Sequence, residues 1–390
     1  MSKIYTENEE KSMNRIKYPL KIVLAAAMTL MPFAMLNGAG TTAADFLKIP
    51  VGVRNVAMGE TGAAASDVNS AYYNPAGLGW LTKPELTFAH SQQIQDVTFE
   101  HVAGILPVTD WGSFGFSMYY QGMSDIQGYD ASGHAISKVG AYSGAAALSY
   151  GKYILGERIE GDGLTAGMTL KYIFSKLDTA RGNAFGGDAG AMYTFKPSQM
   201  TLDNQFAVGA SVVNLGTGMK FDTVSDTLPM GLRFGMLYKF LMTKMNPVLM
   251  LDVNKYKDSD VTVGIGGEIT IKDILALRAG YVSKGSRDTD TGIRFGVGLK
   301  SYGLSFDYAY SGLGDLGTVH RFGLSVNFDT RSGGDNADAS RIFQHGIELF
   351  NQERYLEATL EFNKVLEIDP TNKEALKYMQ DANKKLEEKK

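Results

Sequence analysis

The chain has 390 residues, a formal net charge of -4 and no cysteine. The near-neutral charge gives no reason to expect nucleic acid as a partner, and the lack of cysteine excludes disulfides, thiolate metal sites and a lipidated cysteine. With 45 glycines, 20 tyrosines and 20 phenylalanines, the composition does not fit a helical membrane protein.

The first part of the chain is similar to an export signal. Lys17 and Lys21 precede an apolar run at residues 22–36, and small residues such as Ala39 follow it. The run is short for a transmembrane helix, although an inner-membrane anchor is the alternative. We therefore expect residues 1–40 to be a signal peptide that is cleaved after Ala39 or a few residues later.

Residues 41–83 form a different kind of segment, because they lack a strand period and are rich in small residues. They contain the turn signal Asn74, Pro75, Ala76 and Gly77. Small residues allow close packing in a confined space. This segment is therefore predicted to be a plug inside a barrel.

A two-residue rhythm dominates residues 84–328. Within residues 291–300, for example, Ile293, Phe295 and Val297 alternate with glycine or charge. This pattern is typical of a strand with lipid on one side and a polar lumen on the other. About fourteen such segments occur, each near the roughly 9 to 11 residues that a tilted strand needs to cross a bilayer. The sequence thus predicts an all-β membrane protein, an antiparallel outer-membrane barrel of about fourteen strands.

The connections between these segments alternate in length, which supports an even strand count. Short turns are expected at residues 109–112, 271–273 and 300–303, and longer polar loops at residues 121–140 and 215–229. Outer-membrane barrels have short turns on the periplasmic side and longer loops outside. We therefore expect a bacterial outer-membrane protein whose plug and C-terminal module both lie on the periplasmic side.

Several charged residues take inward positions in the predicted strands. They are Arg233, Asp252, Glu268, Arg278, Arg294, Asp307 and Arg321. Such charges either line a solute path or form salt bridges that fill a closed lumen. Because charged groups remote from water must be paired, a plugged lumen favours structural pairing.

No motif for catalysis or for a cofactor stands out. The five histidines show no metal-ligand spacing. A glycine-rich match at Gly312, Gly314 and Gly317 joins two alternating segments, whereas a dinucleotide loop must follow a strand and open a helix. We expect no enzymatic activity, no cofactor and no metal.

The strand period ends at Phe328, and residues 329–338 are expected to be a polar linker. Residues 339–390 have helical spacing and dense charge, which predicts a small helical module. Positions typical of a tetratricopeptide repeat are occupied by Ile342, Gly346, Leu349, Ala358, Phe362 and Pro370. A plain helical hairpin is the alternative. Since one repeat is fewer than the roughly three that a stable array needs, the module could dock on the barrel, on another copy or on a partner.

Motifs in the plug carry a resemblance to a known family. The spacing of Arg54, Met58, Gly59 and Asp67, followed by Asn74-Pro-Ala-Gly-Leu, resembles the N-terminal region of the PorV/PorQ family, relatives of the FadL-type fatty-acid transporters. The resemblance covers residues 41–328. It implies a fourteen-stranded outer-membrane barrel with an N-terminal plug.

The resemblance implies two alternative functions. Proteins resembling PorV act with the type IX secretion system, which implies a barrel whose residues 339–390 bind periplasmic or secretion partners. FadL relatives carry hydrophobic molecules, which implies instead a transporter of long-chain fatty acids or other hydrophobic ligands. A porin-like envelope protein with a structural role is a third possibility. In each case outer-membrane lipid surrounds the barrel.

Overall fold

The computed structural model describes residues 41–108, 110–157, 162–196, 204–240, 245–283, 291–328, 334–368 and 372–388. The predicted signal peptide, the first half of the predicted linker and Pro370 lie outside these residues. The chain divides into two compact units, Met1–Asn327 and Phe328–Lys390. Each unit is described by itself.

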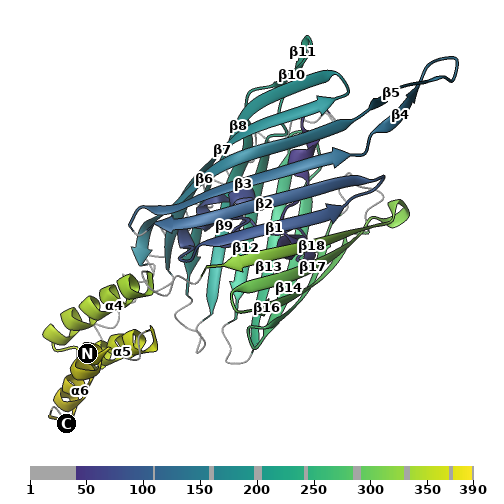
Figure 1. Cartoon of the computed structure of the whole chain (residues 1–390). Coiled ribbons are helices and arrows are strands. Elements are labelled where there is room, and N and C mark those ends of the chain that lie inside the picture. Colours follow the sequence, from purple (N-terminus) through teal and green to yellow (C-terminus); the bar gives the residue numbers. More distant parts are fainter. Residues whose placement is uncertain are drawn as a thin grey trace. The chain divides into compact units, whose positions relative to one another are not determined.

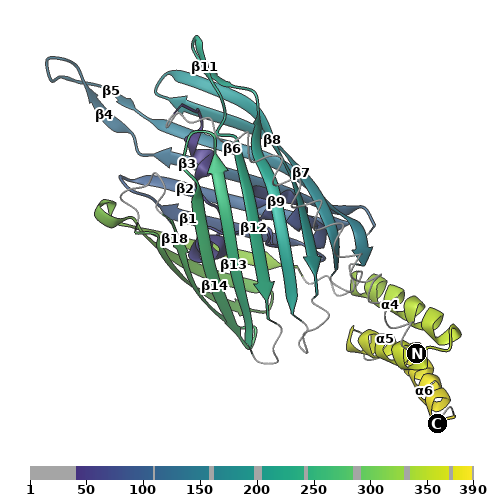
Figure 2. The same ribbon diagram turned by 180° about the vertical axis from the view of Figure 1, so that it is seen from behind.

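Fourteen antiparallel strands of the described residues close into a barrel, which confirms the predicted fold class (Figures 1 and 2). The ring is sealed where β1 pairs with β18. The barrel strands are β1 (Glu85–Gln92), β2 (Val97–Val108), β3 (Gly112–Met123), β6 (Ala141–Glu157), β7 (Asp162–Leu177), β8 (Ala180–Phe195), β9 (Gln205–Gly216), β12 (Gly231–Lys239), β13 (Met245–Tyr256), β14 (Thr262–Ile271), β15 (Leu275–Val282), β16 (Ile293–Ser301), β17 (Leu304–Gly312) and β18 (Thr318–Asn327).

The two ends of the barrel differ. The turn end, where β1 begins and β18 finishes, has tight connections at residues 272–274 and 302–303. The opposite loop end carries two additional hairpins, formed by β4 (Ile126–Tyr129) with β5 (Ala135–Val139) and by β10 (Met219–Phe221) with β11 (Val224–Asp226). Figure 1 shows the β4–β5 hairpin extending beyond the ring. The loop end also contains a tight turn between β7 and β8, so the alternation of short and long connections is not strict.

The outward face of the barrel is apolar, as the strand period predicts. Leu148 and Leu170 are each 70% exposed, and Phe185 is 63% exposed. Their inward neighbours on the same strands, such as Thr169 and Lys171, are buried. A closed barrel leaves no unpaired edge, and an apolar outer surface is stable only against lipid, so this is the architecture of an outer-membrane protein. Among the described residues, no helix is both long enough and apolar enough to cross a membrane.

The plug occupies the lumen in short helical turns, drawn in purple inside the ring in Figures 1 and 2. The turns are η2 (Asp45–Lys48), α2 (Val53–Ala57), α3 (Ser70–Tyr73) and η3 (Pro75–Trp80). One side of the plug meets β6, β7 and β8 through η3, and the other meets β15 to β18 through α2. The plug therefore bridges opposite walls of the barrel.

The chain threads the lumen from the loop end to the turn end. The amide of Ala43 donates to the carbonyl of Thr227 at 2.9 Å, in the connection between β9 and β12. At the other extreme, the carbonyl of Leu81 accepts from Ser113 Oγ at 3.3 Å, beside the start of β3. The first plug residues therefore lie at the loop end of the barrel. They lie at the end of the barrel opposite to the end of β18, because the plug must cross the lumen before β1 can begin.

The second unit consists of α4 (Gly334–Asn351), α5 (Tyr355–Ile368) and α6 (Lys373–Glu388). Helix α4 begins at Gly334, within the predicted linker. Gly346 allows α4 and α5 to approach, because an added Cβ would lie 2.6 Å from the Phe362 ring. The residues predicted to pack in the repeat are buried between the helices: Ile342, Gly346, Leu349, Ala358 and Phe362.

Candidate functional site

Glycines in the barrel wall let the plug backbone lie directly against the strands. A Cβ added at Gly209 of β9 would lie 1.9 Å from the Ala63 carbonyl oxygen, and one at Gly266 of β14 would lie 2.1 Å from the Met58 oxygen. Gly59 has a φ of +74°, a conformation that residues other than glycine rarely adopt. Larger side chains at these wall positions would displace the plug.

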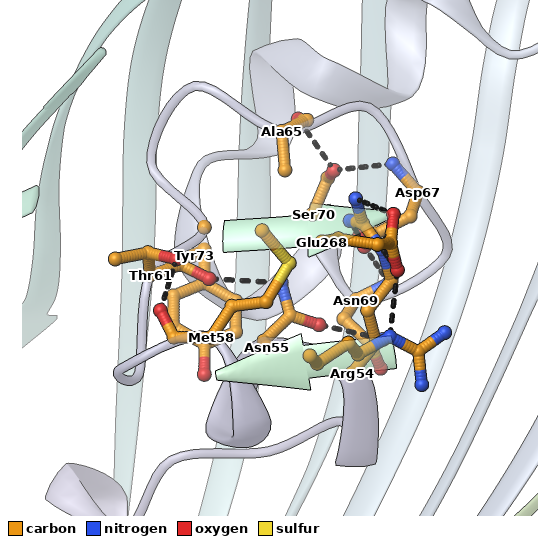
Figure 3. A network of polar contacts seen from close by, with 12 residues as sticks. Arg54, Asn55, Met58, Thr61, Ala65, Asp67, Asn69, Ser70, Tyr73 and Glu268 are labelled. Carbon is orange, nitrogen blue, oxygen red and sulfur yellow. Dashed lines mark hydrogen bonds and ion pairs between the residues drawn. The ribbon is translucent and has the colours of Figure 1, made fainter. Parts of the chain in front are cut away.

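The predicted plug residue Arg54 is tied to the wall by a chain of ion pairs. Its Nη2 lies 2.9 Å from Glu268 Oε1 of β14, and its Nη1 lies 3.2 Å from Asp67 Oδ2 within the plug. Glu268 also accepts from Arg278 Nε at 2.6 Å, and Arg278 Nη1 lies 2.5 Å from Asp307 Oδ1. Figure 3 shows the dashed contact between Arg54 and the carboxylate of Glu268. The structure thus brings together two residues of the plug and three of the strands, a set of contacts that the sequence did not indicate.

The other predicted luminal charges also hold the plug. Asp252 accepts from the amides of Gly62 and Ala63 at 2.7 and 2.8 Å, Arg294 donates to Glu60 at 2.9 Å, and Arg321 donates to the Pro50 carbonyl at 2.8 Å. Each contact joins a strand to the plug. These inward charges therefore bind the plug to the barrel wall in this structure.

Arg233 anchors the loop-end part of the plug through aromatic residues. Its Nη1 donates to the Tyr72 carbonyl at 2.7 Å, and its Nη2 donates to the Tyr256 hydroxyl at 2.7 Å. The guanidinium also lies 4.3 Å from the centroid of the Tyr72 ring. A buried guanidinium is stabilised by such ring contacts as well as by hydrogen bonds.

The predicted turn at residues 74–77 closes the plug on itself. Asn74 caps η3 by accepting from the Ala76 amide at 3.1 Å, and Pro75 takes the first helical position, where its missing N–H costs nothing. A Cβ added at Gly77 would lie 2.3 Å from the Ala65 oxygen. The motif therefore shapes the plug, and its side chains do not line an open passage.

An aromatic and aliphatic cluster fills the loop-end half of the lumen, and we call it the loop-end cluster. Its larger members are Phe46, Leu47, Tyr72 and Tyr73 of the plug, and Phe99, Tyr119, Ile173, Met219 and Leu228 of the wall and loops. The Phe46 and Tyr119 ring centroids are 6.1 Å apart. A water-filled barrel has a polar interior, so an apolar half is a specific feature of this lumen.

Asp258, on the turn between β13 and β14, holds the edge of the loop-end cluster in place. Asp258 Oδ2 accepts from Thr42 Oγ1 at 2.6 Å and from Lys48 Nζ at 3.0 Å. Burial alone would raise the pKa of the Asp258 carboxyl, but these hydrogen bonds outweigh burial and hold its pKa below the ordinary value. The carboxylate therefore stays charged at neutral pH. Its stabilising contribution is present above the ordinary carboxyl pKa and is lost as the pH falls through the lowered value.

The turn-end half of the lumen contains a cavity of about 980 Å³, which we call the vestibule. Its lining combines plug residues with the ends of the strands. The charged members are Arg54, Asp67, Glu85, Lys239, Glu268, Asp273, Arg278, Lys300 and Asp307. The lumen is therefore divided into an apolar half and a hollow, charged half.

A bulge interrupts the pairing of β8 with β9 beside the loop-end cluster. The register shifts between Gly187 and Ala189, so that Asp188 faces two residues of β9. Asn214 there has a φ of 59°, and its amide donates to Asp188 Oδ1 at 2.8 Å. A buried ion pair between Lys171 Nζ and Asp188 Oδ2, at 2.8 Å, closes the wall at this point.

The loop-end cluster was not among the residues predicted from the sequence. A signal was present, since Tyr119 takes an inward position in β3 that alternates with the outward Met118 and Tyr120. An aromatic residue at an inward position is the pattern that would have indicated an apolar lumen. Phe46 gave no comparable signal, because the plug has no period.

No protein-family model matches the chain. A UPF0164 protein of Treponema pallidum (strain Nichols) is 23% identical over 342 residues, which are 83% of this chain and 78% of that protein. The Ralstonia pickettii toluene transporter TbuX has a TM-score of 0.47 at 12% identity, over 71% of this chain and 97% of that one. A Pseudomonas aeruginosa FadL homologue has a TM-score of 0.40 at 12% identity, over 72% of this chain and 98% of that one. None of these three similar proteins carries the PorV/PorQ name that the plug motifs suggested.

Proposed function

We propose that this protein is a plugged outer-membrane barrel that admits small apolar solutes from the loop end. The loop-end cluster is the observation that carries the proposal. Its rings and aliphatic side chains lie inside the lumen, where a porin would present polar groups to water. Apolar surface in that position suits a solute that leaves water on entering.

The vestibule bears on the route that such a solute takes. An apolar molecule gains nothing by leaving the loop-end cluster for a hollow lined with charge. The bulge between β8 and β9 offers another exit, since the Cβ of an alanine at Gly186 would lie 3.1 Å from Leu228 and 3.3 Å from Ile173 of the cluster. We therefore propose a sideways route into the bilayer at the bulge. The turn end then faces the periplasm, as in other barrels of this kind.

The proposal predicts faster uptake of an apolar probe by cells that make the protein. N-phenyl-1-naphthylamine is kept out by an intact outer membrane and becomes fluorescent in an apolar environment. We expect its initial rate of uptake to rise severalfold above that of cells with an empty vector, because the cluster gives it a path around the lipopolysaccharide barrier. Uptake is read as fluorescence after mixing.

Nitrocefin, a polar chromogenic substrate of periplasmic β-lactamase, is the control for general leakage. Its hydrolysis by whole cells should stay at the level of the empty vector, since the plug closes the lumen. Equal acceleration of both probes would contradict the proposal and would indicate a damaged membrane. So would an unchanged rate for the apolar probe at matched amounts of folded protein.

Partner binding through the helical unit is a second candidate function, and one observation favours it. Leu356 and Leu360 lie one turn apart on α5 and are 64% and 59% exposed, within a unit whose other apolar residues are mostly packed. Such a pair suits contact with another helix. The type IX secretion role suggested by the resemblance, with periplasmic partners for residues 339–390, remains a proposal that rests on this surface.

The second candidate predicts partners that depend on the exposed leucines. We expect affinity purification from detergent-solubilised outer membranes to recover an envelope protein with the intact chain and not with a chain that ends at Phe328. Exchanging Leu356 and Leu360 for glutamate should also lose it, since charge at this surface opposes burial. Exchanging the outward Lys364 for glutamate is the matched control, and loss of the partner there would argue against an apolar contact.

A further inference from the structure

We propose that one small anion binds between Arg321 and His101 and holds the plug against the wall where β1 closes on β18. The ligand class is a monatomic halide, with chloride as the abundant example. The inference concerns how the plug is retained, and it goes beyond the proposed function because it does not depend on the solute that the barrel admits.

Arg321 is a buried cation that lacks a carboxylate partner. It is 8% exposed, and its Nη1 donates to the Pro50 carbonyl at 2.8 Å. Its Nε has no hydrogen-bond partner among the described residues, and no ion pair joins the guanidinium to any of them. A buried charge is costly unless an opposite charge lies beside it. This position therefore calls for one negative charge.

The nearest comparable cations of the wall are already neutralised. Arg294, on β16 and two strands away from Arg321, pairs with Glu60 of the plug at 2.9 Å. Arg278 pairs with Glu268 at 2.6 Å. Glu60 attracts Arg321 only from a longer distance, while Arg294 repels it, so the two effects oppose each other. The plug thus offers Arg321 a carbonyl where it offers Arg294 a carboxylate.

A small cavity lies beside this cation. Its volume is about 10 Å³, which is the space of one water-sized species. Ser91, His101 and Arg321 line it from the wall, and residues 51–53 line it from the plug. No carboxylate of the described residues is part of the lining. The cavity therefore combines a cation with the size that a single monatomic ion needs.

The wall side of the cavity supplies further hydrogen-bond donors. His101 is 1% exposed, and neither of its ring nitrogens has a partner among the described residues. One of these nitrogens carries a proton even in the neutral imidazole. Ser91 Oγ accepts from Gln93 Nε2 at 2.6 Å, which leaves the hydroxyl hydrogen of Ser91 to donate. An anion in the cavity can accept from the guanidinium, the imidazole and the hydroxyl.

The register of three strands brings these donors to one place. Ser91 of β1 is the direct partner of Arg321 on β18. Ala89, the previous inward residue of β1, is the direct partner of His101 on β2. The cavity therefore lies over the strand that closes the barrel, with the plug on its other side. An anion there touches both, and its loss should loosen the plug.

An internal water is the competing explanation for the unpaired atoms. A water molecule fits the same volume and can pair with His101, but it brings no charge to Arg321. Hydrogen bonds between a charged donor and an anion are roughly twice as strong as those between neutral groups. The two explanations therefore differ in whether the plug responds to the anion in the surrounding solution.

Bromide locates the ion directly. Crystals of the full chain grown with bromide in place of chloride should show an anomalous difference peak between Arg321 and His101. Crystals of the Arg321→Leu chain should show no peak there, because the cation that attracts the ion is gone.

Protease digestion in lipid nanodiscs tests what the ion does. At equal ionic strength, the plug of the native chain should be cut about tenfold more slowly in sodium chloride than in sodium gluconate, whose anion is too large for the cavity. Tenfold corresponds to about one hydrogen bond to a charged group. Arg321→Leu also loses the Pro50 contact, so the readout is the ratio of the two rates, and in this variant the rates should become equal. Arg321→Lys and His101→Asn, which keep the charge and an N–H donor respectively, should keep part of the difference.

Lys300→Gln is the matched control, because it removes an exposed cation at the turn end, and it should keep the native ratio. Folding of each variant is checked by the shift in gel mobility on heating. Equal rates for the native chain in the two salts would overturn the inference, and the absence of a bromide peak would leave an internal water only. A chloride effect that survives Arg321→Leu would also overturn it, since the effect would then be a general one of the salt.

Discussion

Deleting residues 44–80 is expected to open the barrel to polar solutes. These residues fill the lumen, and Val56, Met58 and Leu78 among them are fully buried. At the turn-end half, the wall that they leave is lined by glycine and charge, which water can wet. The ring of strands is closed by hydrogen bonds that the deletion does not touch. Nitrocefin entry should rise by about tenfold or more, as for a barrel with an aqueous channel.

Planar-bilayer conductance of the purified chain tests the same opening of the barrel without cells. The deleted chain should show open-channel currents where the native chain shows none. Gly266→Val should also raise the conductance, but by less, because the valine side chain would meet the Met58 backbone and displace the plug there. A chain that ends at Phe328 is the control and should conduct no better than the native one. A deleted chain that folds and still excludes nitrocefin would mean that the strands themselves seal the lumen.

Glu268→Ala is expected to loosen the plug without opening the ring of strands. The carboxylate lies between Arg54 and Arg278, so its removal leaves the part-buried guanidinium of Arg54 and the buried one of Arg278 without their shared partner. Breaking a buried ion pair from one side costs about 3–5 kcal/mol. The plug should become sensitive to protease at concentrations that leave the native chain intact, while the barrel keeps its heat-dependent gel mobility.

A tether next to the broken ion pair should reverse this effect. A Cβ at Gly323 would lie 3.4 Å from the Val53 Cβ, close to the roughly 3.5–4.5 Å of a disulfide, and the chain has no cysteine of its own. Val53→Cys with Gly323→Cys, added to Glu268→Ala, should restore protease resistance when oxidised and lose it on reduction. Asp222→Ala, at an exposed carboxylate between β10 and β11, should change nothing. Resistance of the untethered Glu268→Ala chain would show that the glycine contacts alone hold the plug.

The strands could be predicted from the sequence because their signal is local. Phe295 and Val297 lie on one face and Arg294 on the other whatever the rest of the chain does, since the period of a strand is two residues. The inward charges were predicted for the same reason. The number of strands came from repeating this local pattern to Phe328.

The partners of those charges could not be predicted, because closure of the barrel decides them. Arg54 and Glu268 are 214 residues apart, and nothing near either one indicates the other. The direction of the plug and the wall contacts of Phe46 could not be predicted either, because a segment without a hydrophobic period does not indicate which wall it meets. The contact of Asn214 with Asp188 depends in the same way on the register of two strands.

The position of the plug between opposite walls also constrains the order of assembly. Its η3 turn meets β6 to β8, early in the chain, whereas α2 meets β15 to β18, the last strands to be made. The plug, which precedes all the strands in the chain, is therefore among the last segments to gain all its contacts. Contacts between residues so far apart in the sequence slow folding, because the chain must close a long loop before these contacts can stabilise it. The plug therefore depends on a complete barrel: one that lacks its final strands has no Arg294 to pair with Glu60, and the plug stays exposed to the proteases of the envelope.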